Sequence, residues 1–291
     1  MSMSSVLVVA LSVLTSVSIL VMVSLGLALI FGLMKVVNMA HGEFMMIGAF
    51  TAVTLVRYAG IPLFVAIAAS PLLSAAVGVV VEVVLIRPLY KKRLVDTLLV
   101  TFGLSLILFQ LAVDIFGTTS AGISTPLGAL KIGTYSVSVY SSFVLPAAAF
   151  ASVFGLYLVF TRTRYGLLAR ATAQNAEMAS ALGVFAPRIN LITFAIGCGM
   201  AGLAGGLIAP VIAVSPGLGQ TYVAQAFMTV VTGGPAFVFG TVMSSALLGS
   251  VANLVSQWLT TLWGVSALLV TAMVLVRVLP QGISASWRRK F

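Results

Sequence analysis

The chain has 291 residues, of which 61% are hydrophobic and 7% are charged, and its formal net charge is +10. No soluble domain of this length has that composition, so the sequence predicts an all-α membrane protein, a polytopic bundle of about eight or nine transmembrane helices. The positive charges lie in short clusters between apolar blocks, as they do in loops on the inner side of a membrane. They do not form the basic face that would bind nucleic acid.

The composition also excludes most enzymatic and metal chemistry. One histidine, His41, and one cysteine, Cys198, cannot form a metal cluster. The sequence contains neither a Gly-Lys-Ser/Thr phosphate loop nor a Gly-x-Ser-x-Gly nucleophile elbow. We therefore expect no catalytic residue, cofactor or metal. We expect one transmembrane domain over residues 1–291, which takes any energy it uses from another polypeptide.

Apolar blocks long enough for membrane helices alternate with short polar loops. The basic loop 87–93 and the basic region 162–188 should lie in the cytoplasm, and the weakly charged connection 117–140 outside the cell. Alternation through residues 131–139 favours a short strand or a surface helix there. The expected membrane helices cover residues 6–33, 38–56, 63–86, 94–116, 142–161, 191–214, 237–259 and 265–279.

A polar cluster stands at the start of the second apolar block, where Asn38, His41 and Glu43 follow the first membrane helix closely. On a continuous helix Asn38, His41 and Gly42 share one face, whereas Glu43 points elsewhere. An ionisable group near the bilayer centre costs about 2.5–3.5 kcal/mol on insertion scales. Either these side chains lie at a helix start with a structural role, or they line a solute pathway. The sequence leaves both interpretations open.

One further apolar stretch, residues 221–231, is too short to cross the bilayer alone at about 1.5 Å per residue. It is followed by Gly233-Gly234-Pro235, which fits either a re-entrant helix or a simple tight turn. The basic tail, residues 286–290, should lie in the cytoplasm, and that requires an extra crossing through the short stretch. This is why we expect eight or nine crossings.

The basic region 162–188 is predicted to form a helix–turn–helix element outside the membrane. Residues 167–174 are good helix formers. Asn175 can cap a second short helix with Glu177 in its first turn, and Gly183 suits a C-terminal stop. The Ala-rich and weakly charged surface favours docking in a partner's groove over an ordinary solvated hairpin.

Small residues recur at intervals of four within residues 191–214. The resulting two stripes predict very close helix packing, which is a structural role. Their members are Cys198, Gly202 and Gly206 in one stripe, and Gly197, Ala201, Gly205 and Ala209 in the other.

Three segments carry a family resemblance: residues 26–43, the element 170–183, and residues 226–241. Together they resemble the membrane permease subunits of bacterial ATP-binding-cassette importers for branched-chain amino acids, including the related urea and short-amide systems. The resemblance covers nearly the whole chain. It implies an importer permease fold in the bacterial inner membrane. It also implies a second homologous permease subunit, two cytoplasmic ATPase subunits and an extracytoplasmic substrate-binding protein.

The resemblance further implies roles for single residues. Asn38, His41, Gly42 and Glu43 would lie near a solute pathway at the interface between permeases. The cytoplasmic element would dock on an ATPase, and the residues implied in this coupling are Gly166, Arg170, Ala171, Asn175, Glu177, Ala179 and Gly183.

The solute and the class of function are not determined by these residues alone. An importer permease for branched-chain amino acids ranks first, with a urea or short-amide permease as the alternative, because residues 174–175 and 219–222 resemble that branch. A less favoured alternative is an ion-coupled secondary transporter that works through Glu43, and a third is a membrane scaffold that transports nothing. The helical element 162–188 favours the first class, since a channel does not require it.

Overall fold

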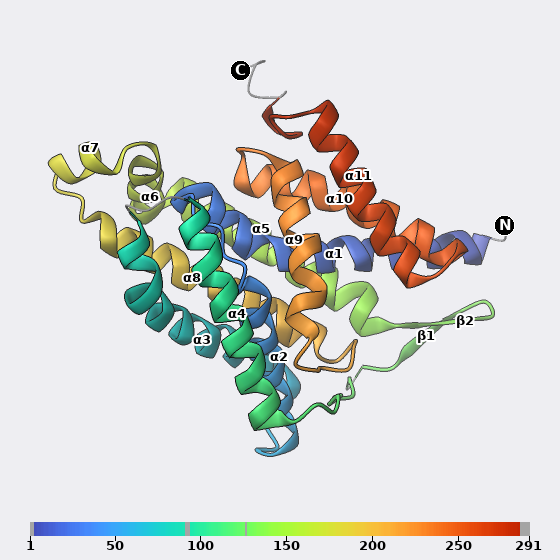
Figure 1. Ribbon diagram of the computed structural model, residues 1–291. Helices are drawn as coiled ribbons and strands as arrows, with labels where there is room; N and C mark the ends of the chain where they lie inside the picture. The colour runs from blue at the N-terminus through green and yellow to red at the C-terminus, as the bar shows by residue number, and fades with distance from the viewer. Residues whose placement is uncertain (1–2, 91–93, 126, 286–291) are drawn as a thin grey trace.

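The computed structural model describes residues 3–90, 94–125 and 127–285, and it confirms the predicted all-α membrane fold (Figure 1). Helix α3 continues into a π-helical turn, Glu82–Ile86, and a 3-10 turn, Arg87–Leu89. Another π-helical turn, Tyr140–Val144, precedes α5. The helices are α1 (Met3–Met34), α2 (His41–Arg57), α3 (Leu63–Val81), α4 (Leu94–Phe116), α5 (Leu145–Arg162), α6 (Arg164–Gln174), α7 (Ala176–Ala181), α8 (Ala186–Ile208), α9 (Leu218–Gly233), α10 (Phe237–Trp258) and α11 (Thr261–Val278).

Within the described residues, seven helical segments are long and apolar enough to cross a membrane. Two further apolar helices, α2 and α9, are shorter, with 17 and 16 residues. With these two helices the described residues agree with the predicted eight or nine crossings. Helix α9 contains residues 221–231, through which we predicted the additional crossing, and its role as a crossing stays a prediction. The tail itself, residues 286–290, lies outside the described residues, as do residues 91–93 of the predicted basic loop.

The expectation that Asn38 and His41 share one helical face is wrong. Helix α2 begins at His41, and Asn38 lies in the non-helical segment 35–40 between α1 and α2. Lys35 has a left-handed conformation with φ +57°, just after the last residue of α1. Asn38 Oδ1 then accepts a hydrogen bond from the Ala40 N–H at 3.1 Å. Such a local bond gives the backbone an alternative to continuing the helix.

The Gly-Gly-Pro sequence forms a tight turn between α9 and α10. Gly234 has φ +83°, a conformation that glycine adopts without strain. Helix α10 follows at once from Phe237. Helix α8 begins at Ala186, before the expected residue 191, because Pro187 fits within the first turn of a helix.

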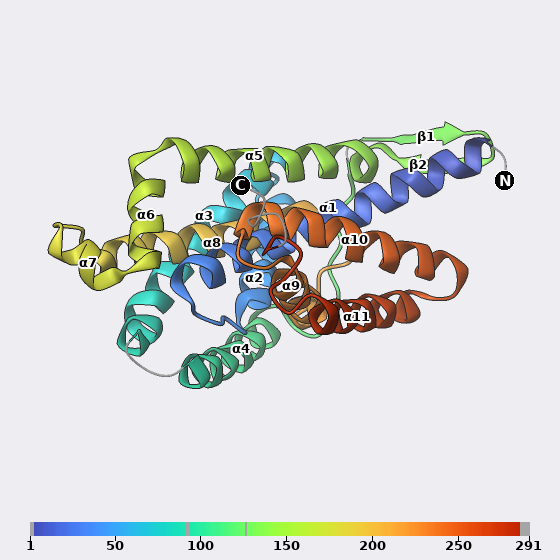
Figure 2. The ribbon, with the colours of Figure 1, turned by 90° about the horizontal axis from the view of Figure 1, so that it is seen from above.

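The connection before α5 contains two strands instead of the single strand or helix expected. Strand β1 (Ala129–Ile132) pairs antiparallel with β2 (Tyr135–Ser138), and Gly133 turns between them with φ +63°. Figure 2 shows this hairpin beside the N-terminus, at the opposite end of the bundle from α6 and α7. That placement agrees with the expectation that the connection 117–140 and the region 162–188 lie on opposite sides of the membrane.

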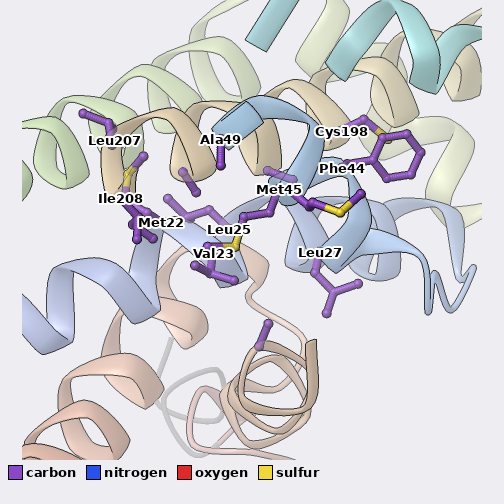
Figure 3. Packing of buried hydrophobic residues seen from close by; sticks show 14 of the residues in the cluster. Met22, Val23, Leu25, Leu27, Phe44, Met45, Ala49, Cys198, Leu207 and Ile208 are labelled. Carbon is purple, nitrogen blue, oxygen red and sulfur yellow. The ribbon is translucent and has the colours of Figure 1, made fainter. Parts of the chain in front are cut away.

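Helix α8 lies at the centre of the bundle, where it packs on α1, α2 and α3. Figure 3 shows buried side chains that gather at this crossing, among them Met22 and Leu25 of α1, Met45 of α2 and Ile208 of α8. Each of these four side chains is at most 1% exposed. The core of the protein is therefore a meeting of three helices around α8.

Glycines allow these helices to approach at backbone contact. A methyl group built on Gly205 would lie 1.9 Å from the carbonyl oxygen of Met45 in α2. A methyl group on Gly26 in α1 would lie 2.3 Å from the carbonyl oxygen of Gly197 in α8. Since real side-chain atoms do not come this close to backbone oxygen, only glycine permits these crossings.

The two predicted stripes of small residues lie on different sides of α8. In the first stripe, Gly202 lies against Ser74 and Gly206 against Ser70, both on α3. In the second stripe, Gly197 lies against α1 and Gly205 against α2. The two stripes thus provide the contact surfaces of α8 for three neighbouring helices, α1, α2 and α3.

The structure also contains an internal repeat that the sequence reasoning missed. The spacing Gly-x6-Ala-Phe occurs from Gly42 in α2 and again from Gly219 in α9. A methyl group on Gly42 would lie 2.2 Å from the carbonyl oxygen of Gly219, so the two motifs touch. Helices α1 and α8 run in opposite directions, as do α2 and α9 (Figure 1), and α3 packs on α8 as α10 packs on α1. These features describe an inverted repeat, a common architecture of membrane transporters.

We expect Gly205→Ala to destabilise the protein by about 1–3 kcal/mol, because the added methyl group forces α2 and α8 apart. The measurement is the thermal unfolding midpoint of the purified chain in mild detergent. Gly103→Ala on α4 is the matched control, since a methyl group there meets nothing within 4 Å. Equal midpoints for the two variants would contradict the proposed backbone contact.

Candidate functional site

The junction between α1 and α2 encloses the predicted polar cluster. Asn38, His41 and Glu43 are each 1% exposed. The Nε2 atom of His41 lies 3.3 Å from the carbonyl oxygen of Val23 in α1. Because a carbonyl only accepts hydrogen bonds, Nε2 carries the proton and Nδ1 is left as an acceptor. The histidine ring also lies against Gly26, where a methyl group would come within 2.9 Å of it.

Helix α4 is attached to this junction by two hydroxyl groups. Ser105 Oγ donates a hydrogen bond to Glu43 Oε1 at 3.0 Å. Thr101 Oγ1 accepts one from the Met39 N–H at 3.1 Å and lies 3.2 Å from the carbonyl oxygen of Val37. The non-helical segment before α2 is therefore held from both sides, by α1 and by α4.

Several polar atoms of the junction have no hydrogen-bond partner. Across the part of the chain that the structure describes, five buried side-chain atoms lack one, and three of them are Asn38 Nδ2, His41 Nδ1 and Glu43 Oε2. A buried group without a partner costs about 1–3 kcal/mol. These side chains therefore reduce stability, which indicates that they are present for another reason.

Gly42, the fourth residue assigned to a solute pathway, is in contact with protein. Its backbone lies against Gly219 at the first turn of α9. With Asn38, His41 and Glu43 also enclosed, these residues face neighbouring helices in this conformation. Their role in a pathway stays a prediction.

The region predicted to couple to an ATPase forms two short helices, α6 and α7, each with a side-chain N-cap. The Gly166 N–H donates to Thr163 Oγ1 at 3.1 Å, and the Met178 N–H donates to Asn175 Oδ1 at 2.9 Å. Gly183 follows α7 with φ +86°. The predicted Asn175 cap and Gly183 stop are thus both present.

This hairpin is fixed to the membrane helices. The Tyr165 hydroxyl lies 2.6 Å from Thr193 Oγ1 on α8, and a methyl group on Gly166 would lie 2.5 Å from the Phe160 backbone. Ala179 is 4% exposed. Gly166 and Ala179 therefore hold the hairpin to the body, whereas the other residues assigned to coupling are exposed: Arg170, Ala171, Asn175, Glu177 and Gly183.

Four large apolar side chains project from the hairpin and the turn after it. Their exposed fractions are 61% for Leu167, 61% for Met178, 80% for Leu182 and 61% for Phe185. We call these four residues the apolar cap. The sequence reasoning missed them, although apolar residues between flanking arginines were a usable signal. Several large exposed apolar side chains on so short a segment favour contact with another protein or with a membrane.

A second feature that the sequence reasoning missed is a groove of about 340 Å³ between α1, α9, α10 and α11. Its wall contains hydroxyl and amide groups and no charged side chain. The hydroxyl and amide side chains that line the groove are Ser16, Thr221, Gln225, Asn253, Ser256 and Thr261. We call this space the polar groove.

Hydrogen bonds between α1 and α10 hold one rim of the polar groove. Asn253 Nδ2 donates to Ser16 Oγ at 2.8 Å and to the carbonyl oxygen of Ser12 at 3.2 Å. Gln257 Nε2 donates to Ser12 Oγ at 2.7 Å. The amides of Asn253 and Gln257, four residues apart in an apolar helix, were the sequence signal for this site.

Two other acids, Glu82 and Asp114, have hydrogen-bond partners. Glu82 is buried and pairs with Arg87 at 3.1 Å, and it accepts a hydrogen bond from the Tyr90 hydroxyl at 2.6 Å. Burial and the bond to Glu82 raise the pKa of the Tyr90 phenol far above its usual value, so Tyr90 remains a donor. Asp114 accepts a bond from Gln110 at 2.8 Å. Among the described residues no group of three or more His, Cys, Asp or Glu could hold a metal ion.

Comparison with known proteins gives consistent matches. The sequence model of a family described as branched-chain amino acid transport system, permease component, matches residues 9–279. The chain is 31% identical to the high-affinity branched-chain amino acid transport system permease protein BraD of Pseudomonas aeruginosa, over 78% of this chain and 79% of that protein. It is 25% identical to the probable permease protein LivH of Methanocaldococcus jannaschii, over 94% and 90%. It is 26% identical to LivH of Salmonella typhimurium, over 90% of each. No solved structure matches.

We expect Thr101→Val to destabilise the protein by about 1–3 kcal/mol, because the Met39 N–H loses its partner on the buried Thr101 side chain while that side chain keeps its shape. Thr161→Val is the matched control, since that exposed hydroxyl bonds only within its own helix, to Tyr157. Thermal unfolding in detergent compares the two variants. A similar change in both would mean that α4 does not hold the junction.

Proposed function

Because the chain belongs to the family of branched-chain amino acid transport system permease components, and is thus a multi-pass permease subunit of the inner membrane, we propose that it imports a branched-chain amino acid with energy from separate ATPase subunits. Its transport partners would be a second homologous permease subunit, two cytoplasmic ATPases and an extracytoplasmic substrate-binding protein. The chain itself is a transport subunit and not an enzyme.

The observation that carries this proposal is the apolar cap on a rigid base. The four side chains stand on the α6–α7 hairpin, which has two capped helices and is bonded to α8 through Tyr165 and Thr193. A partner that covered the cap would remove apolar surface from water, at roughly 25 cal/mol per Å². It would also hold α6 firmly enough to move α8 with it. A docked ATPase is the partner that the proposed function requires at this place.

The polar groove is our proposal for part of the solute path. Lipid chains cannot pair with the amide of Gln225 or the hydroxyl of Thr261, so water or another polypeptide must cover this face in the membrane. A wall without charge binds a zwitterion weakly, which suits a permease whose selectivity comes from a separate binding protein. In the assembled importer the second permease subunit would close the groove.

A urea or short-amide importer is the second candidate for the solute. The amide group of Gln225 in the polar groove favours it, since amides pair well with other amides. The names of the relatives compared above favour branched-chain amino acids. Competition between labelled leucine and unlabelled urea for uptake by the assembled importer decides between them. An ion-coupled transporter has less support, since Glu82 is paired and Glu43 is enclosed.

We expect Leu182→Glu to lower both ATPase co-purification and ATP-dependent leucine uptake by about tenfold, because a carboxylate in an apolar interface would lose its hydration. The assay uses the full set of subunits in proteoliposomes. Leu182 is 80% exposed, so the folded chain should tolerate the change.

Leu130→Glu is the control for this experiment. Leu130 is also exposed, but it lies on β1 at the other end of the bundle from the apolar cap (Figure 2). The control should retain its ATPase partners. Unchanged co-purification in Leu182→Glu, or uptake by the isolated chain along an ion gradient, would contradict the proposal.

A further inference from the structure

An apolar cleft of about 530 Å³ lies between α2, α3 and α4, away from the polar groove. Nearly all of its lining is aliphatic or aromatic, with Met46 and Phe50 from α2, Leu73 from α3, and Leu108 and Ala112 from α4. Its volume falls in the range of about 300–1,000 Å³ that is usual for small-ligand sites. The cleft can therefore hold an elongated apolar group.

A polar cavity of about 300 Å³ continues the cleft at one end. The two spaces share four lining residues, among them Phe50 and Phe116, whose rings are stacked with centroids 4.1 Å apart. The lining changes beyond these rings, where Arg57, Thr119 and Ser120 take over from the apolar side chains. Together the two spaces form one elongated site with an apolar body and a basic head, which we call the amphipathic site.

The basic head of the amphipathic site has no acidic counterpart. Arg57 is the last residue of α2 and is exposed, and it forms no ion pair with any residue that the structure describes. No aspartate or glutamate lines the polar cavity. One wall of the cavity is held in place, since Ala121 exchanges two backbone hydrogen bonds of 2.8 Å with Val214.

We propose that the amphipathic site binds an anionic glycerophospholipid of the bilayer, with its phosphate at Arg57 and one acyl chain in the apolar cleft. The guanidinium group presents paired donors that match phosphate oxygens, and the hydroxyls of Thr119 and Ser120 add further donors. An anionic lipid such as phosphatidylglycerol fits better than phosphatidylethanolamine, because the cavity has no acid to pair with an ammonium group. The bound chain would fill the space between α3 and α4 and support α4 on the junction that holds Glu43.

The test measures lipid binding to the full chain, purified in mild detergent and stripped of lipid. Phosphatidylglycerol or phosphatidylethanolamine is added back, and bound lipid is counted by native mass spectrometry. We expect one phosphatidylglycerol per chain, bound about tenfold more tightly than phosphatidylethanolamine. Arg57→Gln should remove this preference, whereas Lys131→Gln on the exposed strand β1 removes one cation elsewhere and should leave it intact.

A second variant tests the apolar part of the site. Ala112→Phe should fill the cleft and lower binding of both lipids at least about tenfold. Arg57→Gln lies on the surface and keeps the test open if Ala112→Phe does not fold. Equal loss of preference in Arg57→Gln and Lys131→Gln, equal binding of the two lipids, or displacement of lipid when a second permease subunit binds would each overturn the proposal.

Discussion

Direct backbone contact between helices is the constraint on which the rest of this structure depends. In a bilayer, apolar side chains gain nothing by leaving lipid for another helix, so association relies on close packing and hydrogen bonds. The contacts of Gly26 with Gly197 and of Gly42 with Gly219 bring α1 and α2 against α8 and α9 at the shortest possible distance. The second contact joins the two copies of the repeated Gly-x6-Ala-Phe motif. The same glycines therefore set the helix spacing and relate the two halves of the molecule.

These contacts also decide where polar groups can lie. Because α1, α2 and α9 meet so closely, His41 and Asn38 are enclosed although some of their atoms have no partner. The packing around them must offset that cost. Helix α4 is held differently, through the hydroxyls of Thr101 and Ser105, and the amphipathic site lies further along the same face of α4, at Leu108 and Ala112. A helix that depends on two hydrogen bonds and a filled cleft is more easily displaced than one clamped by glycine.

The central position of α8 links the packing to the proposed energy coupling. Helix α8 begins shortly after the hairpin of α6 and α7, and Thr193 on α8 bonds to Tyr165 on α6. A force applied to the apolar cap would reach the helix that contacts α1, α2 and α3. The polar groove, formed by α1, α9, α10 and α11, lies on the far side of those contacts. Movement of α8 could thus change the groove without any contact between solute and ATPase.

The sequence by itself determined the membrane class, the approximate helices, the Asn175 cap, the Gly183 stop and the two small-residue stripes. These features depend on composition or on residues within about four positions of each other, so a linear pattern records them. Only the tertiary structure decided that Asn38 leaves the helix of His41, that Gly166 and Ala179 face inward, and that Gly42 meets Gly219. It alone assembled the polar groove and the amphipathic site, whose residues come from three or more helices. The physical reason is that such contacts depend on how helices far apart in the sequence cross. The local patterns of hydrophobicity and helix propensity in the sequence do not specify that crossing.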